Sequence, residues 1–376
     1  MRIGGNDYNL HELAGAFGDL GTLIPFLVGY ITISKMDPVG VLVGFGLFKI
    51  IVGLYFKTPV PIQPMKAIGT AAISHAGALT AGAIWAAGLF TGVFWLIMGL
   101  TGAVTWIAKL TSRPVVHGII LGLGLGFILE GVKMMETNPA LALFAAALTF
   151  LLLSHERMPA MLILLGMGGL MALTAEPALM GELGQMSFRL RLPTFALTQL
   201  GQHDLVTGVL VLGLPQVALT LGNAIIATVE ENNQLFPAHP MTVKAVAIDH
   251  GIMNLVATSM GGVPMCHGAG GMAAHIRFGA RTGGALVILG VLVLGVGLFC
   301  ANSIAILLKL FPRALLGVLL MFGGLELAAG MHGNHVRKDE RYVMLLTAGV
   351  SMWNMGVGYG AGLALWHAYQ RGWLKA

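Results

Sequence analysis

The sequence predicts an all-α polytopic membrane protein, built as a seven-plus-seven transmembrane inverted repeat. Three observations predict this class: an apolar composition, a division into apolar runs of membrane-spanning length, and two matched proline-containing breaks. Of the 376 residues, 56% are hydrophobic and 10% are charged, whereas a soluble domain carries about 25% charged residues. The basic residues are scattered singly, so the net charge of +5 indicates no nucleic-acid partner.

A transmembrane helix needs about 20 apolar residues, and on this length the chain divides into fourteen spans. We expect them at residues 11–33, 38–56, 64–78, 81–108, 114–132, 138–154, 158–175, 205–229, 242–260, 268–279, 283–309, 313–331, 339–353 and 355–371. The first repeat is residues 1–175 and the second is residues 205–376, with a polar, proline-containing linker at 176–204. An odd number of spans per repeat inverts the second copy. We expect no C-terminal soluble domain and no cleavable signal peptide.

Spans three and ten are too short to cross a membrane alone, and each follows a proline. Residues 60–62 (VPI) precede span three, and residues 263–265 (VPM) precede span ten, 203 residues later. Matched short, broken helices in the two halves are typical of secondary transporters that bind their substrate at the bilayer midplane.

The first break predicts a short helix that starts inside the protein. Residues 57–63 (KTPVPIQ) contain two prolines, which favour extended backbone, and such backbone persists at membrane depth only where protein or a cavity surrounds it. Pro64 suits the first position of a helix. Three amides then lack intrahelical partners: those of Met65, Lys66 and Ala67.

The second break repeats this arrangement with residues 261–271 (GGVPMCHGAGG). Its helix starts with Gly268, Ala269 and Gly270, whose small side chains let a ligand reach the backbone N–H groups. Two helix N-termini of roughly +0.5 charge each, together with Lys66, suit a small dianion. The alternative is that both breaks are structural kinks and that Lys66 pairs with Asp19 or reaches an interface.

Polar residues inside spans one and eight are further candidates, because polar groups in a membrane are costly. Three roles are open for Asp19: to balance the charge of Lys66, to carry a coupling proton, or to form a hydrogen bond with the backbone. Thr22 lies on the same helix face as Asp19. In span eight Gln216, Thr220 and Asn223 share one face, which fits either a ligand cavity or a hydrogen-bonded helix seam. Lys49 and Lys66 are the lysines inside spans.

No metal, disulfide or catalytic pattern is predicted. Cys266 and Cys300 lack ligand spacing. The histidines, and the polar residues near span nine, also lack the spacing of metal ligands. His267 is notable among them because it lies at the start of span ten. The full set is His75, His117, Asp249, His250, Asn254, His267 and His275. We therefore expect no enzyme activity and no cofactor.

Loop charges predict the orientation. If the N-terminus is cytoplasmic, thirteen Lys and Arg residues lie on the inside and six on the outside. This excess favours two cytoplasmic termini. We expect an integral protein of the plasma (inner) membrane, in contact with lipid.

Four segments resemble the molybdate transporter type 1 family, within the sulfate permease superfamily. They are FGDLGTLIPF at 17–26, PVPIQPMKAIG at 59–69, LPQVALTLGNAIIAT at 214–228 and GGVPMCHGAGGMAAHIRFGARTGG at 261–284. The resemblance implies the fold of sulfate and nucleobase permeases, in which a core domain (spans 1–4 and 8–11) moves against a gate domain (spans 5–7 and 12–14). It also implies a homodimer and molybdate bound between the starts of spans three and ten.

The resemblance places a set of substrate-binding residues by position, with Asp19 as a coupling or salt-bridge residue. That set is Gly21, Thr22, Gln63, Met65, Lys66, Gln216, Asn223, His267, Gly268, Ala269 and Gly270, and the free amide predicted at the start of span three adds Ala67 as a substrate-binding candidate.

The leading functional hypothesis is a secondary active transporter that imports molybdate without ATP. Sulfate and tungstate stay open as substrates, since sequence does not measure the cavity. A nucleobase permease would need a carboxylate pair in spans eight and ten, where this chain has Gln216, Gly268 and His267. A passive anion channel or a motor-like structural protein is an alternative of another class. The coupling ion, proton or sodium, is also open.

Overall fold

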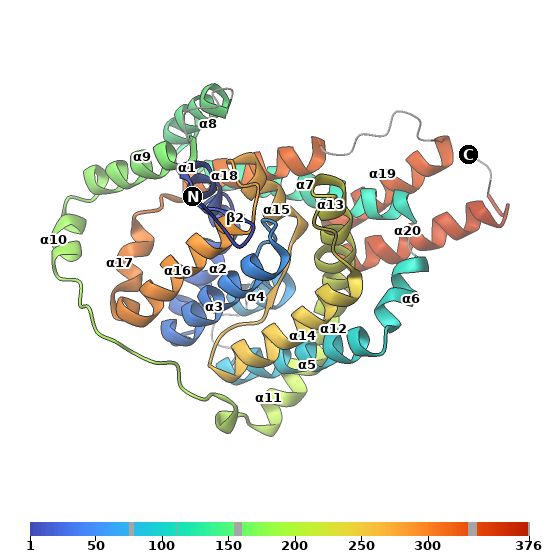
Figure 1. The fold of residues 1–376 in the computed structure, drawn as a ribbon, viewed down its shortest axis with the longest axis horizontal. Coiled ribbons are helices and arrows are strands. Elements are labelled where there is room, and N and C mark those ends of the chain that lie inside the picture. The colour runs from blue at the N-terminus through green and yellow to red at the C-terminus, as the bar shows by residue number, and fades with distance from the viewer. Residues whose placement is uncertain (75–78, 111, 154–159, 330–336, 375–376) are drawn as a thin grey trace.

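The computed structural model describes residues 1–374 except 75–78, 111, 154–159 and 330–336, so His75 lies outside the described residues. Helices dominate the fold (Figure 1). The elements up to the linker are β1 Arg2–Ile3, β2 Asn6–Asp7, α1 Leu10–Ala16, α2 Leu20–Val28, η1 Gly29–Ile33, α3 Pro38–Phe56, β3 Gln63–Pro64, α4 Lys66–Ser74, α5 Ala81–Leu100, α6 Ala103–Leu110, α7 Arg113–Met135, α8 Pro139–Leu153 and α9 Ala160–Ala175.

The linker and the second half continue the helical fold. Their elements are α10 Ala178–Gly184, η2 Leu197–Gln199, α11 Gln202–Thr207, η3 Gly208–Gly213, α12 Leu214–Leu219, η4 Thr220–Ala227, α13 Thr228–Leu235, α14 Val243–Ser259, β4 Met265–Cys266, α15 Ala269–Arg277, α16 Gly284–Phe299, η5 Ala301–Ser303, α17 Ile304–Lys309, α18 Arg313–Ala329, α19 Lys338–Trp353 and α20 Met355–Gln370.

Three of the described helices, α3, α5 and α7, are long and apolar enough to cross a membrane, and up to seven spans result if each of four bent helix pairs counts as one.

Two of the bent pairs correct the expectation of continuous helices at 11–33 and 283–309. The first bends by 42° between α1 and α2, and the second by 91° between α16 and α17. The first break surrounds Gly18, where an added Cβ would lie 2.5 Å from the Ala274 carbonyl oxygen. The helix therefore yields to close packing against α15.

Helix pairs that join the two halves of the chain form the core. The most extensive contacts are those of α7 with α18, α3 with α16, and α5 with α14. Glycines permit the close approach: a Cβ on Gly317 of α18 would lie 2.5 Å from the carbonyl oxygen of Gly131 on α7. Small residues at helix contacts serve the same purpose in membrane proteins generally.

The linker, expected as a polar, proline-containing stretch, contains the short helix α10 and the turn η2. Beyond α10 it runs along the edge of the molecule (Figure 1). Its backbone is fixed to the end of α16, because the amides of Arg189 and Arg191 donate to the carbonyls of Phe299 and Leu298 at 2.9 and 2.8 Å. The Arg191 guanidinium also pairs with Asp37 at 2.8 Å.

Candidate functional site

The two proline-containing segments meet in the middle of the fold as a two-stranded antiparallel sheet. Gln63 of β3 pairs with Cys266 of β4, and Pro64 pairs with Met265. The Met65 amide adds a hydrogen bond of 2.9 Å to the Pro264 carbonyl. The paired residues are just over 200 positions apart in sequence, so this pairing joins the two halves of the chain at one place.

Side chains from neighbouring helices satisfy the extended backbone. Asn254 of α14 holds Met265 at both ends, since its Nδ2 donates to the carbonyl at 2.8 Å and its Oδ1 accepts from the amide at 2.7 Å. Lys49 of α3 is fully buried and donates to the Ile62 carbonyl at 2.8 Å. These bonds explain how irregular backbone survives in the interior of a membrane protein.

A short helix leaves each end of this sheet. Helix α4 begins at Lys66, directly after β3, and α15 begins at Ala269 with Gly268 as its N-cap. Because each helix follows its strand within a few residues, both helices start beside the sheet. Both lie near the centre of the molecule (Figure 1).

At the start of α4, two of the three backbone amides that we expected to be free are hydrogen-bonded. Of the three amides predicted to be unpartnered, that of Met65 is bound to Pro264, and that of Ala67 donates to Gln216 Oε1 at 2.9 Å. The Lys66 amide makes no hydrogen bond within the described residues. Side-chain capping and strand pairing, neither visible in a helix pattern, account for the difference.

At α15 the expectation holds. The amides of Gly268, Ala269 and Gly270 form no hydrogen bond to any described residue. Gly268 leaves no room for a side chain, because an added Cβ would collide with Gln63 Oε1 and lie 3.8 Å from Asn223 Nδ2. The start of α15 thus presents backbone N–H groups beside two side-chain amides.

Four buried polar atoms around these helix starts have no hydrogen-bond partner among the described residues. They are Asp19 Oδ2, Gln63 Oε1, Lys66 Nζ and Asn223 Oδ1. Two of these residues are hydrogen-bonded to each other, since Gln63 Nε2 donates to Asp19 Oδ1 at 2.6 Å. A buried polar group without a partner costs about 1–3 kcal/mol. A cluster of such groups therefore marks a place that water or a polar ligand completes.

Asp19 and Lys66 do not form the ion pair that was one sequence-based alternative. The Lys66 ammonium has no hydrogen-bond partner, and the Asp19 carboxylate is bound by Gln63 instead. Asp19 lies within the electrostatic reach of both Lys49 and Lys66. Thr22 is buried one turn further along α2. Asp19 thus balances two buried cations without neutralising either by direct contact.

The Lys66 ammonium instead faces an aromatic ring. Its Nζ lies 4.2 Å from the centre of the Phe127 ring, which belongs to α7. The same ring contacts α15, because a Cβ on Gly270 would collide with it. One side chain from α7 therefore covers the starts of both short helices.

Three of the other predicted residues have structural roles in the fold, as hydrogen-bonding partners or as core residues. Gln216 caps Ala67 and donates to Thr220 Oγ1 at 3.0 Å. The ring nitrogens of His267 contact the Pro61 carbonyl and Asp249. Met65 is fully buried in the core.

Lys49, Asn254 and Phe127 were not among the predicted site residues. A charge inside an apolar span is a signal that singles out Lys49, and Asn254 carries the weaker signal of an amide inside a span. Phe127 has no sequence signal, since an aromatic residue in an apolar helix is ordinary core material.

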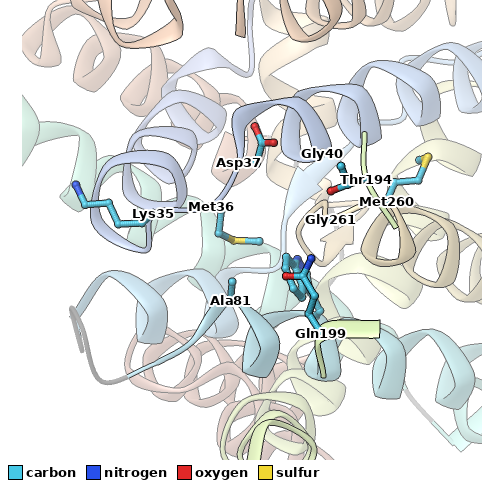
Figure 2. A pocket seen from close by; sticks show the side chains of 10 residues that line it. Lys35, Met36, Asp37, Gly40, Ala81, Thr194, Gln199, Met260 and Gly261 are labelled. Atoms are coloured by element: carbon cyan, nitrogen blue, oxygen red, sulfur yellow. The ribbon is translucent and has the colours of Figure 1, made fainter. Parts of the chain in front are cut away.

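No group of three or more His, Cys, Asp or Glu side chains that suits a metal ion occurs in the described part of the chain. A separate cavity of about 310 Å³ lies where α3 and α5 begin and α14 ends, beneath the linker. Figure 2 shows its lining, which includes Lys35, Asp37 and Gln199 and none of the predicted site residues.

Solved structures with the same fold include membrane anion transporters. The transmembrane domain of a cyanobacterial bicarbonate transporter, BicA, matches with a TM-score of 0.59 and 16% identity, over 95% of this chain and 99% of that one. Murine Slc26a9 in its inward-facing state matches with a TM-score of 0.64 and 13% identity, over 100% of this chain and 70% of that one. The chain therefore shares the fold of these two transport proteins, which is the mostly helical membrane fold that the sequence predicted.

Sequence relatives define the family. The family model described as a molybdate transporter of the MFS superfamily matches residues 11–127 and 208–327. Molybdate transporter 2 of Arabidopsis thaliana is 32% identical over 94% of this chain and 86% of its own length. Molybdate transporter 1 of Chlamydomonas reinhardtii is 28% identical over 94% and 90%. The chain belongs to this molybdate transporter family, and these relatives confirm that it is a transport protein rather than an enzyme.

Proposed function

We propose that the protein is a secondary active transporter that imports molybdate, with the anion held between the starts of α4 and α15. The observation that carries this proposal is the juxtaposition of the free Gly268, Ala269 and Gly270 amides with the unpartnered Lys66 ammonium. Helix N-termini and a lysine favour anions. The family relationship supports molybdate as that anion.

Transport follows if two bodies move against each other. The core domain comprises spans 1–4 and 8–11 and carries both short helices, and the gate domain comprises spans 5–7 and 12–14. Phe127 lies on the gate side of this division and covers Lys66, so an arriving anion displaces the ring from the ammonium. The displacement gives anion binding a direct mechanical effect on α7. Both termini lie in the cytoplasm and the protein resides in the plasma membrane, as the loop charges favour.

Sulfate and tungstate are the second candidate substrates, because both are tetrahedral dianions that the same donors suit. Calorimetric titration of the purified protein with molybdate, tungstate, sulfate and xanthine tests the proposal. Molybdate should bind most tightly and xanthine should not bind. Preference for sulfate would reassign the substrate, and binding of xanthine alone would overturn the anion site. Uptake by proteoliposomes that saturates with molybdate concentration would exclude a passive channel.

A further inference from the structure

A carboxylate and an imidazole form a close pair beside the start of α15. His267 Nε2 lies 2.6 Å from Asp249 Oδ2; the histidine side chain is fully buried and that of Asp249 is 16% exposed. The other ring nitrogen, Nδ1, lies 3.0 Å from the Pro61 carbonyl oxygen. His267 directly precedes Gly268, the N-cap of α15. The pair therefore connects the partly exposed Asp249 with the first residue of the candidate anion site.

The two contacts of the ring fix how many protons the pair holds. A carbonyl oxygen only accepts, so Nδ1 carries a hydrogen. A contact of 2.6 Å between Nε2 and a carboxylate oxygen requires a second hydrogen between them. Without that hydrogen, the lone pair of Nε2 would face a negative oxygen. Two contacts to acceptor oxygens suit an imidazole that donates from both nitrogens, so the geometry has a place for one shared proton, and the pair is neutral when that proton is bound.

The neighbouring His250 does not hold such a proton. Its Nδ1 lies 3.0 Å from the Val246 carbonyl and therefore donates, while its Nε2 accepts from the His267 amide at 3.3 Å. These partners fix His250 as a neutral ring, 4.6 Å from the His267 ring centre.

Titratable groups also lie on the elements that pack around the pair. Helix α13, which contacts α15, carries Glu230 and Glu231, and α7, which also contacts α15, carries His117 and Lys133. Lys49 of α3 binds the Ile62 carbonyl, one residue from Pro61. Lys109 lies at the end of α6, which contacts α14, and Lys244 lies at the start of α14 itself. The α15 helix adds His275, whose Nδ1 contacts the Gly15 carbonyl, and Arg277 at its far end. Helix α5, the main partner of α14, has no titratable side chain.

We propose that the Asp249–His267 pair is the binding site of a proton that travels with the anion. This inference rests on the proposed function and names its coupling ion. The proton enters at Asp249, binds between the two side chains and leaves by the same route after the transport movement, with no other covalent bond formed or broken.

Proton binding is coupled to anion binding because the Asp249–His267 pair connects the two proline-containing segments. His267 bonds to Pro61 just before β3 and itself lies between β4 and α15. Loss of the shared proton leaves Asp249 facing an unprotonated nitrogen, which releases the ring and loosens the extended segment before α4. Proton binding and anion binding then favour each other, and linkage requires the effect to be reciprocal.

Proteoliposomes containing the unmodified protein and an internal pH dye provide the first test. With the membrane voltage clamped at zero, molybdate uptake should bring protons inward, and an inward proton gradient should raise accumulation about tenfold per pH unit for one proton per anion. Uptake without proton entry would overturn the inference while the proposed function stands. Absence of uptake under every gradient would overturn the proposed function.

The second test replaces the carboxylate. In Asp249→Asn the amide donates its own hydrogen to Nε2, so the ring stays in place without a shared proton. Molybdate uptake in this variant should persist and lose its gradient dependence, and Asp249→Glu should restore the dependence. Glu230→Gln, at a partly exposed carboxylate bonded to Gln234, is the matched control and should behave like the unmodified protein. Gradient dependence retained in Asp249→Asn would overturn the inference, and the dye measurement on unmodified protein decides the question if that variant does not fold.

Discussion

The ammonium of Lys66 lies 4.2 Å from the centre of the Phe127 ring and has no hydrogen-bond partner among the described residues. A buried lysine normally has an anionic or carbonyl partner. Here an aromatic ring from α7 takes that place, next to the free amides at the start of α15. We interpret the Phe127 ring as occupying the place of the anion beside Lys66. The ring must leave the ammonium when the substrate binds.

Removing the aromatic character of Phe127 should therefore tighten binding. Phe127→Leu keeps an apolar side chain beside Gly270 but loses the cation–π attraction, worth about 0.5–2 kcal/mol. We expect the molybdate Kd to fall about 2- to 30-fold in calorimetric titration. Phe94→Leu, at a ring that contacts Trp95, is the control and should leave the Kd unchanged. A weaker Kd in Phe127→Leu would show that the ring supports the site and does not compete with the anion.

Lys66→Ala should abolish molybdate uptake while the protein still folds. The side chain makes no hydrogen bond that its loss would leave unsatisfied, and it supplies the mobile positive charge of the site. Uptake in proteoliposomes measures the loss, and thermal unfolding verifies the fold. Lys35→Ala, at an exposed lysine of the separate cavity, serves as the control. Unchanged uptake in Lys66→Ala would confine anion binding to the backbone donors.

A methyl group on Gly268 should block the site sterically. The φ of this residue, −104°, permits alanine, but the added Cβ would collide with Gln63 Oε1. We expect Gly268→Ala to weaken molybdate binding at least about tenfold, a cost of about 1.4 kcal/mol. Gly166→Ala adds a methyl group where nothing lies within 4 Å and should bind normally. Equal affinities in the two variants would place the anion elsewhere.

Asn254 should matter for stability more than for chemistry. Asn254→Ala leaves the amide and the carbonyl of Met265 without partners, at about 1–3 kcal/mol for each buried group. The melting temperature in detergent should fall by several degrees. Asn302→Ala, which removes an exposed contact to Arg191, should change it little. An unchanged melting temperature in Asn254→Ala would mean that water replaces the lost bonds.

The sequence predicted helix positions well because apolar length and proline breaks are local properties. It also located the two short helices, since Pro61 and Pro264 each interrupt an apolar run. The capping of Ala67 by Gln216 and the covering of Lys66 by Phe127 join residues far apart in sequence. No local pattern specifies such contacts, so these parts of the site required the structure. The bends at α1–α2 and α16–α17 were missed because hydropathy does not record close packing.

The most direct test of the anion site is a structure with molybdate bound, in which molybdenum is located by its anomalous scattering or by its density. We predict one molybdenum position with its oxygens in hydrogen-bonding range of Lys66 Nζ and of the amides of Gly268, Ala269 and Gly270, with the Phe127 ring displaced. Molybdenum in the cavity beside Lys35, or at the helix starts with Phe127 still against Lys66, would contradict this account.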